Sequence, residues 1–322
     1  MSGRVGVIGV GRLGPTLAAL LASGRVAGAS LVAWSPVKEG GEPPAWLAGS
    51  GVDVVADWHD LMAAVDGVVV DLAPALHWHE REVLSEAAFE AGRALLVDAP
   101  LADFPLVYDR IQTVRRHRGA RLWSVRPLRR GLALRGAVEE VEAGALGEVL
   151  AVHASLHLPV GGRGASFEQE TNDIVDAALA LAPAALSRVF AEGERGAGGA
   201  METLDAVARL EGDAILSLEV GQVLPASLGE ESDVVLEVTG REGFVRVEPG
   251  RAAVTVAGKG VARVPWREDT IAEAVAAWLG GSDEGEAEAA ADRRLIAALR
   301  MIKRSRAKGE AVGPEAAQSK GA

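Results

Sequence analysis

A glycine-rich turn close to the amino terminus is the first group of residues that could do chemistry. Gly9, Gly11 and Gly14 have the spacing G-x-G-x-x-G, directly after the apolar run of residues 5–8. Leucines recur at helical spacing after the turn, and strand, glycine turn and helix in this order are the context in which the motif binds a dinucleotide. The second glycine lets backbone approach a pyrophosphate, and the helix start offers N–H groups to it. The alternative is a tight turn in another kind of α/β protein.

The residues after the second expected strand bear on which dinucleotide would fit. An NAD site usually carries an acid about 20 residues past the glycines, bonded to the ribose 2′-hydroxyl. This chain has Ser35 there, Lys38 three residues later and Arg12 within the glycine turn. A hydroxyl and two cations suit a 2′-phosphate, so the pattern favours NADP(H) over NAD(H). The alternative is that Lys38 is a solvated surface lysine.

Three acids in the second half of the chain have the spacing of one helix face. Glu170, Asp173 and Asp176 stand at i, i+3 and i+6. Burial or a neighbouring carboxylate raises the pKa of an aspartate above its usual value of about 3.9. Such a face could therefore act as acid or base, or bind a cationic substrate. The alternative is a solvated acidic helix start, which the helix dipole favours.

Two groups of basic side chains are further candidates. Arg126, Arg129 and Arg130 follow the sixth expected strand. Their guanidinium groups could hold a substrate carboxylate or phosphate, or they could pair with surface acids. Histidines stand at positions 59, 77 and 79. No acid spacing near these histidines supports zinc, so no metal site is predicted.

These candidates must be positioned by an alternation of strands and helices in the first 125 residues. Strands are expected at 4–8, 30–34, 52–55, 67–71, 94–98 and 120–125, and helices at 13–23, 58–65, 77–91 and 103–118. Such alternation predicts a doubly wound parallel sheet with right-handed crossovers. Ligands of these sheets bind at the carboxyl ends of the strands, where the glycine turn and Ser35 lie.

The second half of the chain has consecutive strands with few helices. Strands are expected at 148–158, 186–193, 203–209, 213–221, 233–239, 243–247, 252–256 and 261–264, and helices at 172–182, 269–279 and 289–307. This pattern predicts a mostly antiparallel sheet with helices on one face. We therefore expect a dinucleotide-binding domain at 1–125, a substrate and assembly domain at 126–308, and a disordered tail at 309–322.

The composition limits the class of protein. A chain of 322 residues is long enough for two domains, and the absence of cysteine excludes disulfides, thiolate metal sites and thiol nucleophiles. The net charge of -12 argues against nonspecific binding to nucleic acid or anionic membranes. No apolar run reaches about 18 residues, and a core strand follows Met1 closely. We therefore expect a cytoplasmic protein without a membrane span or signal peptide.

Several segments, taken in order, resemble one enzyme family. Besides the glycine turn, they are residues 72–77 (Leu-Ala-Pro-Ala-Leu-His), 144–148 (Gly-Ala-Leu-Gly-Glu) and 238–243 (Val-Thr-Gly-Arg-Glu-Gly). The chain resembles the glucose–fructose oxidoreductase/inositol 2-dehydrogenase (Gfo/Idh/MocA) family along nearly its whole length. The resemblance implies a Rossmann domain and an α/β domain with a large open sheet. It also implies NAD(P)-dependent hydride transfer to or from a sugar, polyol or related molecule, by a homodimer or homotetramer assembled through that sheet.

The resemblance also implies which residues contact the cofactor and the substrate. The matching cofactor residues are Gly9, Gly11, Arg12, Leu13, Gly14, Ser35, Pro74, His77 and Pro100. The charge argument above adds Lys38 to them. Arg129 matches the family's arginine after the sixth strand, so Arg129 and Glu170 of the acidic face are the expected substrate contacts.

The chain departs from the family at both catalytic positions. The family's lysine after the fifth strand is replaced by Ala99 in the tripeptide Asp98-Ala99-Pro100, and its acid/base histidine is replaced by Asp173. In the family an acid follows that histidine three residues later, and Asp176 retains this acid. We therefore predict an altered catalytic set of Asp173, Asp176 and Asp98. The alternative is a non-catalytic member, acting as a nucleotide-binding sensor or a partner-binding subunit, and a third reading keeps the scaffold alone.

Overall fold

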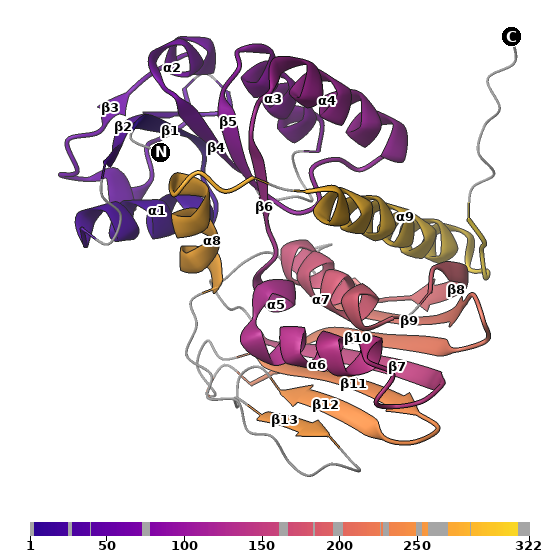
Figure 1. The fold of residues 1–322 in the computed structure, drawn as a ribbon. Helices are drawn as coiled ribbons and strands as arrows, with labels where there is room; N and C mark the ends of the chain where they lie inside the picture. The colour runs from indigo at the N-terminus through magenta and orange to yellow at the C-terminus, as the bar shows by residue number, and fades with distance from the viewer. Residues whose placement is uncertain are drawn as a thin grey trace, which may run out of the picture. The chain divides into compact units, whose positions relative to one another are not determined.

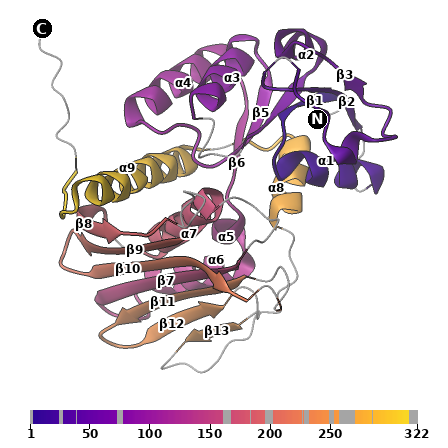
Figure 2. The same cartoon turned by 180° about the vertical axis from the view of Figure 1, so that it is seen from behind.

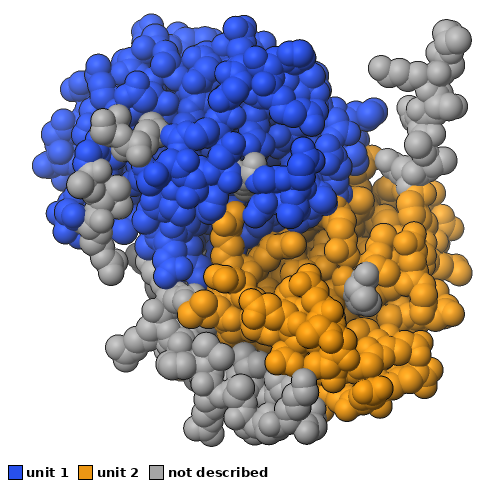
Figure 3. Space-filling model, in the orientation of Figure 1, with its two compact units in different colours: residues 1–127, 268–293 blue, residues 128–267, 294–322 orange. Residues whose placement is uncertain are grey.

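The computed structural model describes most of the chain as two compact units. The described residues are 3–24, 28–38, 40–72, 78–160, 167–182, 184–195, 202–225, 227, 232–248, 253–256, 270–283 and 285–314. Unit 1 comprises residues 1–127 and 268–293, and unit 2 comprises residues 128–267 and 294–322 (Figure 3). Each unit has its own sheet and its own core.

Unit 1 is built on a six-stranded parallel sheet (Figure 1). Its strands are β1 (Gly3–Gly9), β2 (Ala29–Ser35), β3 (Asp53–Val54), β4 (Gly67–Asp71), β5 (Ala94–Asp98) and β6 (Leu122–Val125). The order across the sheet is β3-β2-β1-β4-β5-β6, so the sheet grows in opposite directions from β1. Doubly wound sheets bind ligands at such a switch point, next to the carboxyl ends of the strands.

Helices cover both faces of this sheet. They are α1 (Leu13–Ala22), the short 3-10 helix η1 (Ala45–Leu47), α2 (Trp58–Ala64), α3 (Trp78–Glu90) and α4 (Pro105–Arg118). In α1 the leucines at 13, 17 and 20 are buried against Val5 and Val7 of β1, as their helical spacing predicts. α3 and α4 pack against each other on the opposite face (Figure 1). The expected strands and helices of this region are confirmed, with ends within two residues.

A late segment of the chain returns to unit 1. α8 (Thr270–Leu279) and the first part of α9 (Glu286–Lys308) belong to this unit. Trp278 is fully buried, in one apolar cluster with Val275 and the leucines of α1. Sequence reasoning placed this segment in the second domain. The apolar spacing predicts a helix there but does not identify the surface that the helix covers.

Unit 2 is built on a seven-stranded sheet. Its strands are β7 (Val149–Pro159), β8 (Leu186–Glu192), β9 (Thr203–Leu210), β10 (Ile215–Leu224), β11 (Asp233–Gly240), β12 (Phe244–Glu248) and β13 (Ala253–Val256), in the order β13-β12-β11-β7-β10-β9-β8. The pair β7 and β10 is parallel and the other pairs are antiparallel. The mostly antiparallel sheet is therefore confirmed. The strand expected at 261–264 lies outside the described residues.

Helices of unit 2 lie on one face of its sheet (Figure 1). They are α5 (Pro127–Arg130), α6 (Leu132–Glu142), α7 (Phe167–Leu181) and the later part of α9. Sequence reasoning did not predict α5 or α6, and it started α7 five residues too late. On β9 the residues facing the helices are buried, whereas Asp205, Val207 and Arg209 are exposed on the opposite face. Figure 2 shows that face of the sheet.

The residues after α9 pack on unit 2. The backbone N–H and carbonyl groups of Val312 each bond to Val189 of β8 at 2.8 Å, and the Val312 side chain is buried. This differs from the disordered tail expected from residue 309. The reason is that an edge strand offers unpaired backbone groups to a segment passing beside it. Residues 315–322 lie outside the described part of the chain.

The longest described helix is α9, which spans 23 residues and carries charged side chains along its length. Within the described residues, no helix combines the length and the apolar character needed to cross a membrane.

Candidate functional site

The glycine turn lies at the carboxyl end of β1. Gly9 has a φ of +99°, a left-handed conformation that favours glycine. The Nε1 group of Trp34 donates a hydrogen bond to the carbonyl oxygen of Gly9 at 2.8 Å, and Trp34 is fully buried. The Trp34 side chain of β2 therefore holds the turn in place before α1 begins.

A buried carboxylate occupies the start of α1. Asp71 is the last residue of β4 and is fully buried. It accepts hydrogen bonds from the backbone N–H groups of Leu13 at 3.0 Å and Gly14 at 2.8 Å. These groups are among the helical N–H groups that have no partner within the helix. Burial raises the pKa of Asp71 to about 6, although the N–H groups of the turn oppose that shift.

The glycines of the turn make room for this carboxylate. A Cβ atom at Gly11 would lie 2.3 Å from Oδ1 of Asp71, and one at Gly14 would lie 2.9 Å from Oδ2. A side chain at either position would therefore displace Asp71. The motif spacing serves an internal contact here, in addition to any approach of a phosphate.

Arg12, inside the turn, is held by Asp98 at the end of β5. The Nε and Nη2 groups of Arg12 donate to Oδ1 of Asp98 at 3.0 and 2.8 Å. The Asp98 side chain is 5% exposed. β5 and β2 lie on opposite sides of β1 in the sheet, so Arg12 is engaged on the side away from Ser35. The Asp98 carboxylate, predicted as catalytic, serves as the counter-ion of this arginine.

Arg81 of α3 ties the ends of β4 and β5 together. Its Nη1 group donates to the carbonyl oxygens of Asp98 at 2.7 Å and Pro100 at 3.0 Å, and its Nη2 group donates to that of Leu72 at 2.6 Å. Arg81 is fully buried, and burial lowers its pKa to about 10, so it remains charged at neutral pH. Pro100 thus lies at the strand ends, as expected, with its carbonyl engaged internally.

The groups expected to hold a 2′-phosphate are not gathered at one point. Ser35 is fully buried and its hydroxyl donates to the carbonyl oxygen of Pro36 at 3.2 Å. The Lys38 side chain is 75% exposed, and its Nζ lies 3.4 Å from a carboxylate oxygen of Glu80. Since Arg12 is bonded to Asp98, Lys38 is the cation of this set that faces solvent. The expected contacts Pro74 and His77 lie outside the described residues.

In unit 2, α7 carries the predicted acidic face. Asp173 is 5% exposed and Asp176 is 2% exposed, while Glu170 is half-buried. The alternative of a solvated acidic helix start is therefore wrong for the two aspartates. The amide of Gln169 donates to Oδ1 of Asp173 at 3.5 Å.

Asp176 has a cationic partner from α5. The Nη1 group of Arg129 lies 3.3 Å from Oδ1 of Asp176, and the Arg129 side chain is 32% exposed. Arg294 of α9 interacts electrostatically with this pair: burial and the charge of Arg129 lower the pKa of Arg294, and the charge of Asp176 raises it. The structure thus brings Arg129 and Asp176 together, and it places the amide of Gln169 beside Asp173.

Arg126 has a structural place in unit 1. It pairs with Asp292 of α9, and the two side chains are 1% and 0% exposed. This arginine is consequently not placed to meet a substrate. Among the described residues, no group of three or more histidine or acidic side chains is arranged to hold a metal ion.

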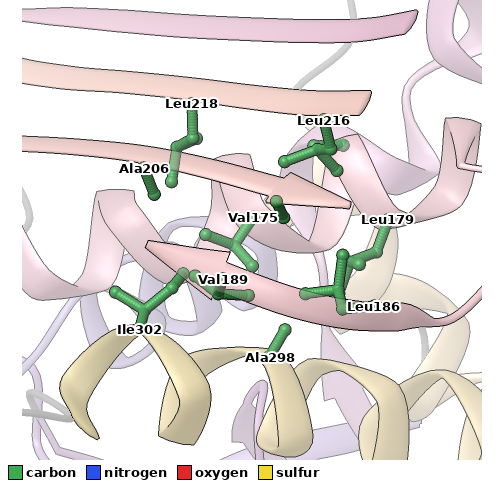
Figure 4. A pocket seen from close by; sticks show the side chains of 11 residues that line it. Val175, Leu179, Leu186, Val189, Ala206, Leu216, Leu218, Ala298 and Ile302 are labelled. Atoms are coloured by element: carbon green, nitrogen blue, oxygen red, sulfur yellow. The ribbon is translucent and has the colours of Figure 1, made fainter. Parts of the chain in front are cut away.

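A small cavity in unit 2 is apolar throughout. It has a volume of about 10 Å³ and lies where α7, the sheet and α9 meet (Figure 4). Val175, Leu216 and Ile302 are among its lining side chains. A site with room for about one water and no polar group cannot bind a sugar or polyol. This cavity is a packing defect of the core.

Comparisons with known proteins cover part of the chain by sequence and nearly all of it by fold. No protein-family model matches it. Inositol 2-dehydrogenase 1 of Saccharopolyspora erythraea is 36% identical over 157 residues, which cover 48% of this chain and 45% of that protein. The match therefore spans less than half the length of this curated relative.

Solved structures match along nearly the whole chain. The myo-inositol 2-dehydrogenase of Lactobacillus plantarum has a TM-score of 0.75 at 18% identity, covering 98% of this chain and 100% of that one. The scyllo-inositol dehydrogenase of Lactobacillus casei, solved with NAD(H) and scyllo-inositol, has a TM-score of 0.71 at 20% identity, covering 97% and 99%. At these identities the likeness is one of fold. The two-domain fold that the resemblance to the Gfo/Idh/MocA family implies is confirmed.

Within this fold, two residues that sequence reasoning missed organise the glycine-turn end of unit 1. They are Asp71 and Arg81, which contact the glycine turn and the ends of β4 and β5. A signal for Asp71 was present, because a carboxylate ending the valine run at 68–70 requires a buried partner. Arg81 gave a weaker signal, since an arginine in a helix is usually solvated.

Proposed function

We propose that the chain is an oxidoreductase that transfers a hydride between a nicotinamide dinucleotide and a sugar, polyol or related small molecule. The observation that carries this proposal is the glycine turn at the switch point of the unit 1 sheet. The inositol dehydrogenases named above support the substrate class, because they share the fold over nearly the whole chain.

The residues of the turn are suited to a dinucleotide in most respects. Gly9 and Gly11 allow backbone to approach a pyrophosphate, and the start of α1 offers its dipole. Bound dinucleotide supplies the hydride acceptor or donor. We assign its phosphates to Gly9, Gly11, Arg12, Leu13 and Gly14. The Asp71 carboxylate opposes this assignment, because it already bonds to the N–H groups of Leu13 and Gly14.

We assign the acid/base role to Asp173. Oxidation of an alcohol needs a group that takes the hydroxyl proton, and such a group contributes about 10²–10⁴-fold to the rate. Asp173 is buried on α7 and stands where the family resemblance expects the acid/base histidine, and its carboxylate accepts a hydrogen bond from the amide of Gln169. Asp176 and Arg129 are then assigned to holding the substrate, together with Glu170.

We propose a preference for NADP(H) because β2 ends in Ser35 and not in an acid. Lys38 is the exposed cation that could meet a 2′-phosphate, while Glu80 beside it opposes one. Lys38→Ala should then weaken binding of NADP(H) and leave binding of NAD(H) unchanged. Equal loss for both dinucleotides would remove the proposed preference.

A non-catalytic role remains the second candidate, because Ala99 and Asp173 replace the family's lysine and histidine. One structural observation favours it. Asp71 satisfies N–H groups of the glycine turn from within, so the turn holds its shape without a ligand. In this reading the chain is a nucleotide-binding sensor or a partner-binding subunit.

We also propose a homodimer or homotetramer formed through the face of the unit 2 sheet opposite its helices. Phe190 and Val207 are paired on β8 and β9 and are 39% and 54% exposed, and Ile215 of β10 is 45% exposed. These apolar side chains share the face with the exposed charges of Asp205 and Arg209, and exposed apolar groups bordered by polar ones mark association surfaces. A cytoplasmic location stays a prediction.

The first experiment is a thermal melt of the whole protein with NADPH, NADP, NADH and NAD. A dinucleotide at about 100 times its Kd should add about 2.7 kcal/mol to the free energy of unfolding, which raises the melting temperature by several degrees. Absence of a shift with all four would count against the proposed cofactor and turn attention to protein partners.

The second experiment follows hydride transfer with a panel of polyols and sugars. Asp173→Asn should lower kcat by about 10²–10⁴-fold if Asp173 moves the proton. Glu168→Gln, on the first turn of the same helix, is the matched control and should retain the wild-type rate. Turnover that Asp173→Asn leaves intact would remove Asp173 from the proposed role.

A further inference from the structure

The glycine turn already contains an anion of the protein's own. The Asp71 carboxylate accepts from the N–H groups of Leu13 and Gly14 at 3.0 and 2.8 Å, and the N–H group of Gly11 also bonds to it. Asp71 is fully buried, and the nearest positions of the turn are glycines whose Cβ atoms would collide with its oxygens. The site is therefore shaped around a bound carboxylate.

These N–H groups are the ones that a dinucleotide pyrophosphate uses in such a turn. Backbone N–H groups at a helix start bind phosphate through hydrogen bonds and the helix dipole. Each N–H group that Asp71 occupies is lost to the pyrophosphate, and the ionised carboxylate repels it across a short, buried distance. Protonation of Asp71 removes the charge and weakens its hold on these N–H groups.

We propose that Asp71 controls the affinity of the glycine turn for a dinucleotide. The Asp71 carboxylate opposes dinucleotide binding while it is ionised and permits binding when it is protonated. The inference rests on the proposed cofactor role of the turn. It adds a pH-dependent control on that role, located in a residue that does not belong to the G-x-G-x-x-G motif.

The charged groups facing Asp71 leave it poised to titrate. They are Asp98 on β5, Arg12 in the turn and Arg81 on α3, and Arg12 is already bonded to Asp98. The remaining side chain against Gly14 is Trp46 of η1, which is uncharged. Burial is the largest influence on Asp71 and raises its pKa to about 6. The control would thus operate between pH 5 and 8.

The test measures the Kd of NAD for the whole protein at pH 5.5 and pH 8 by tryptophan fluorescence and calorimetry. NAD is the probe because it lacks a 2′-phosphate, and a phosphate monoester would itself titrate near pH 6. In the wild-type protein the Kd should be about tenfold higher at pH 8 than at pH 5.5. Asp71→Asn should bind NAD at pH 8 at least as tightly as the wild type does at pH 5.5, with little dependence on pH.

Asp66→Asn is the matched control. Asp66 precedes β4 on the same sheet, is exposed, and accepts a hydrogen bond from the backbone N–H of Arg4 at the opposite end of the strands. The Asp66→Asn substitution removes the same charge and should leave the wild-type pH dependence of the Kd intact. This comparison separates an effect at the glycine turn from one of net charge.

Two outcomes overturn the inference but not the proposed cofactor role. One is equal NAD affinity of the wild type and Asp71→Asn at pH 8, and the other is the same pH dependence of the Kd in the two proteins. If Asp71→Asn does not fold, a wild-type Kd that is flat across this pH range overturns it. If neither protein binds NAD at either pH, both the inference and the proposed cofactor role fail.

Discussion

At the residue scale, the glycine-turn end of unit 1 gathers two arginines and two aspartates. Arg12 pairs with Asp98, Arg81 bonds to the carbonyl oxygens of the strand ends, and Asp71 bonds to the helix start. These contacts hold most of the buried polar groups, although the Nε group of Arg81 is buried without a hydrogen-bond partner among the described residues. The end of the sheet is therefore pre-organised before any ligand arrives.

The titration of Asp71 should be visible in stability. Its pKa is raised by burial from 3.8 to about 6, so the folded protein binds the proton more tightly than the unfolded chain does. The stabilising contribution is complete below pH 3.8 and is lost as the pH rises through 6. Between pH 5 and 7.5 the wild type should lose about 1–2 kcal/mol of unfolding free energy relative to Asp71→Asn. Urea titrations at the two pH values measure this difference, and parallel stability curves would contradict it.

The buried pair Arg126 and Asp292 should matter far more than a surface pair. Asp292→Ala leaves a buried guanidinium without its counter-ion and should cost about 3–5 kcal/mol of unfolding free energy. Arg209→Ala breaks an exposed pair with Asp213, whose side chain is 86% exposed, and should cost less than about 1 kcal/mol. Denaturant unfolding of both variants checks the contrast, and equal losses would contradict it.

At the element scale, the fold of unit 1 depends on a helix from the far end of the chain. α8 packs on α1 and supplies Val275, Trp278 and Leu279 to the cluster that also holds Val5 and Val7. The parallel sheet would otherwise expose part of that face, and buried parallel sheets need helices on both faces. A protein cut at residue 127 therefore lacks part of its first core.

Trp278→Ala tests the role of α8. Removing this fully buried side chain should cost about 3–5 kcal/mol through lost burial and the cavity left behind. Trp58, which is half-buried at the start of α2 and stacked on His59, is the matched control. Its replacement by alanine should cost less than about half as much. Similar melting temperatures for the two variants would count against the importance of α8.

At the scale of the whole molecule, the chain contains two sheets of different kind, one parallel and one mostly antiparallel. The glycine turn lies at the carboxyl end of β1 in the parallel sheet of unit 1. The sheet of unit 2 has α7 and its acids on one face, and Phe190, Val207 and Ile215 are exposed on the other. The comparisons show the same fold over nearly the whole chain in inositol dehydrogenases. The proposed oxidoreductase therefore rests on the complete fold together with the glycine turn.

Val207→Lys tests the proposed assembly. A lysine at this 54% exposed position would place a charge in the apolar set of the sheet face and should raise the dissociation constant of the oligomer at least about tenfold. Val54→Lys, at a 57% exposed position on β3, is the matched control and should leave assembly unchanged. Sedimentation velocity at micromolar concentration distinguishes these outcomes, and a monomeric wild type would contradict the proposal.

The sequence by itself determined the strands and helices of unit 1, the mostly antiparallel sheet and the position of the glycine turn. These follow from apolar periodicity and turn chemistry, which act over a few residues. The tertiary structure alone decided that Asp71 enters the turn from 58 residues away, that Arg126 meets Asp292 across 166 residues, and that α8 joins unit 1. Such contacts depend on which surfaces fold together, and no local pattern records that choice. The same reason applies to Arg12 and Ser35, which the motif assigns to one cofactor. Arg12 bonds to Asp98 at the end of β5, whereas Ser35 ends β2 on the other side of β1.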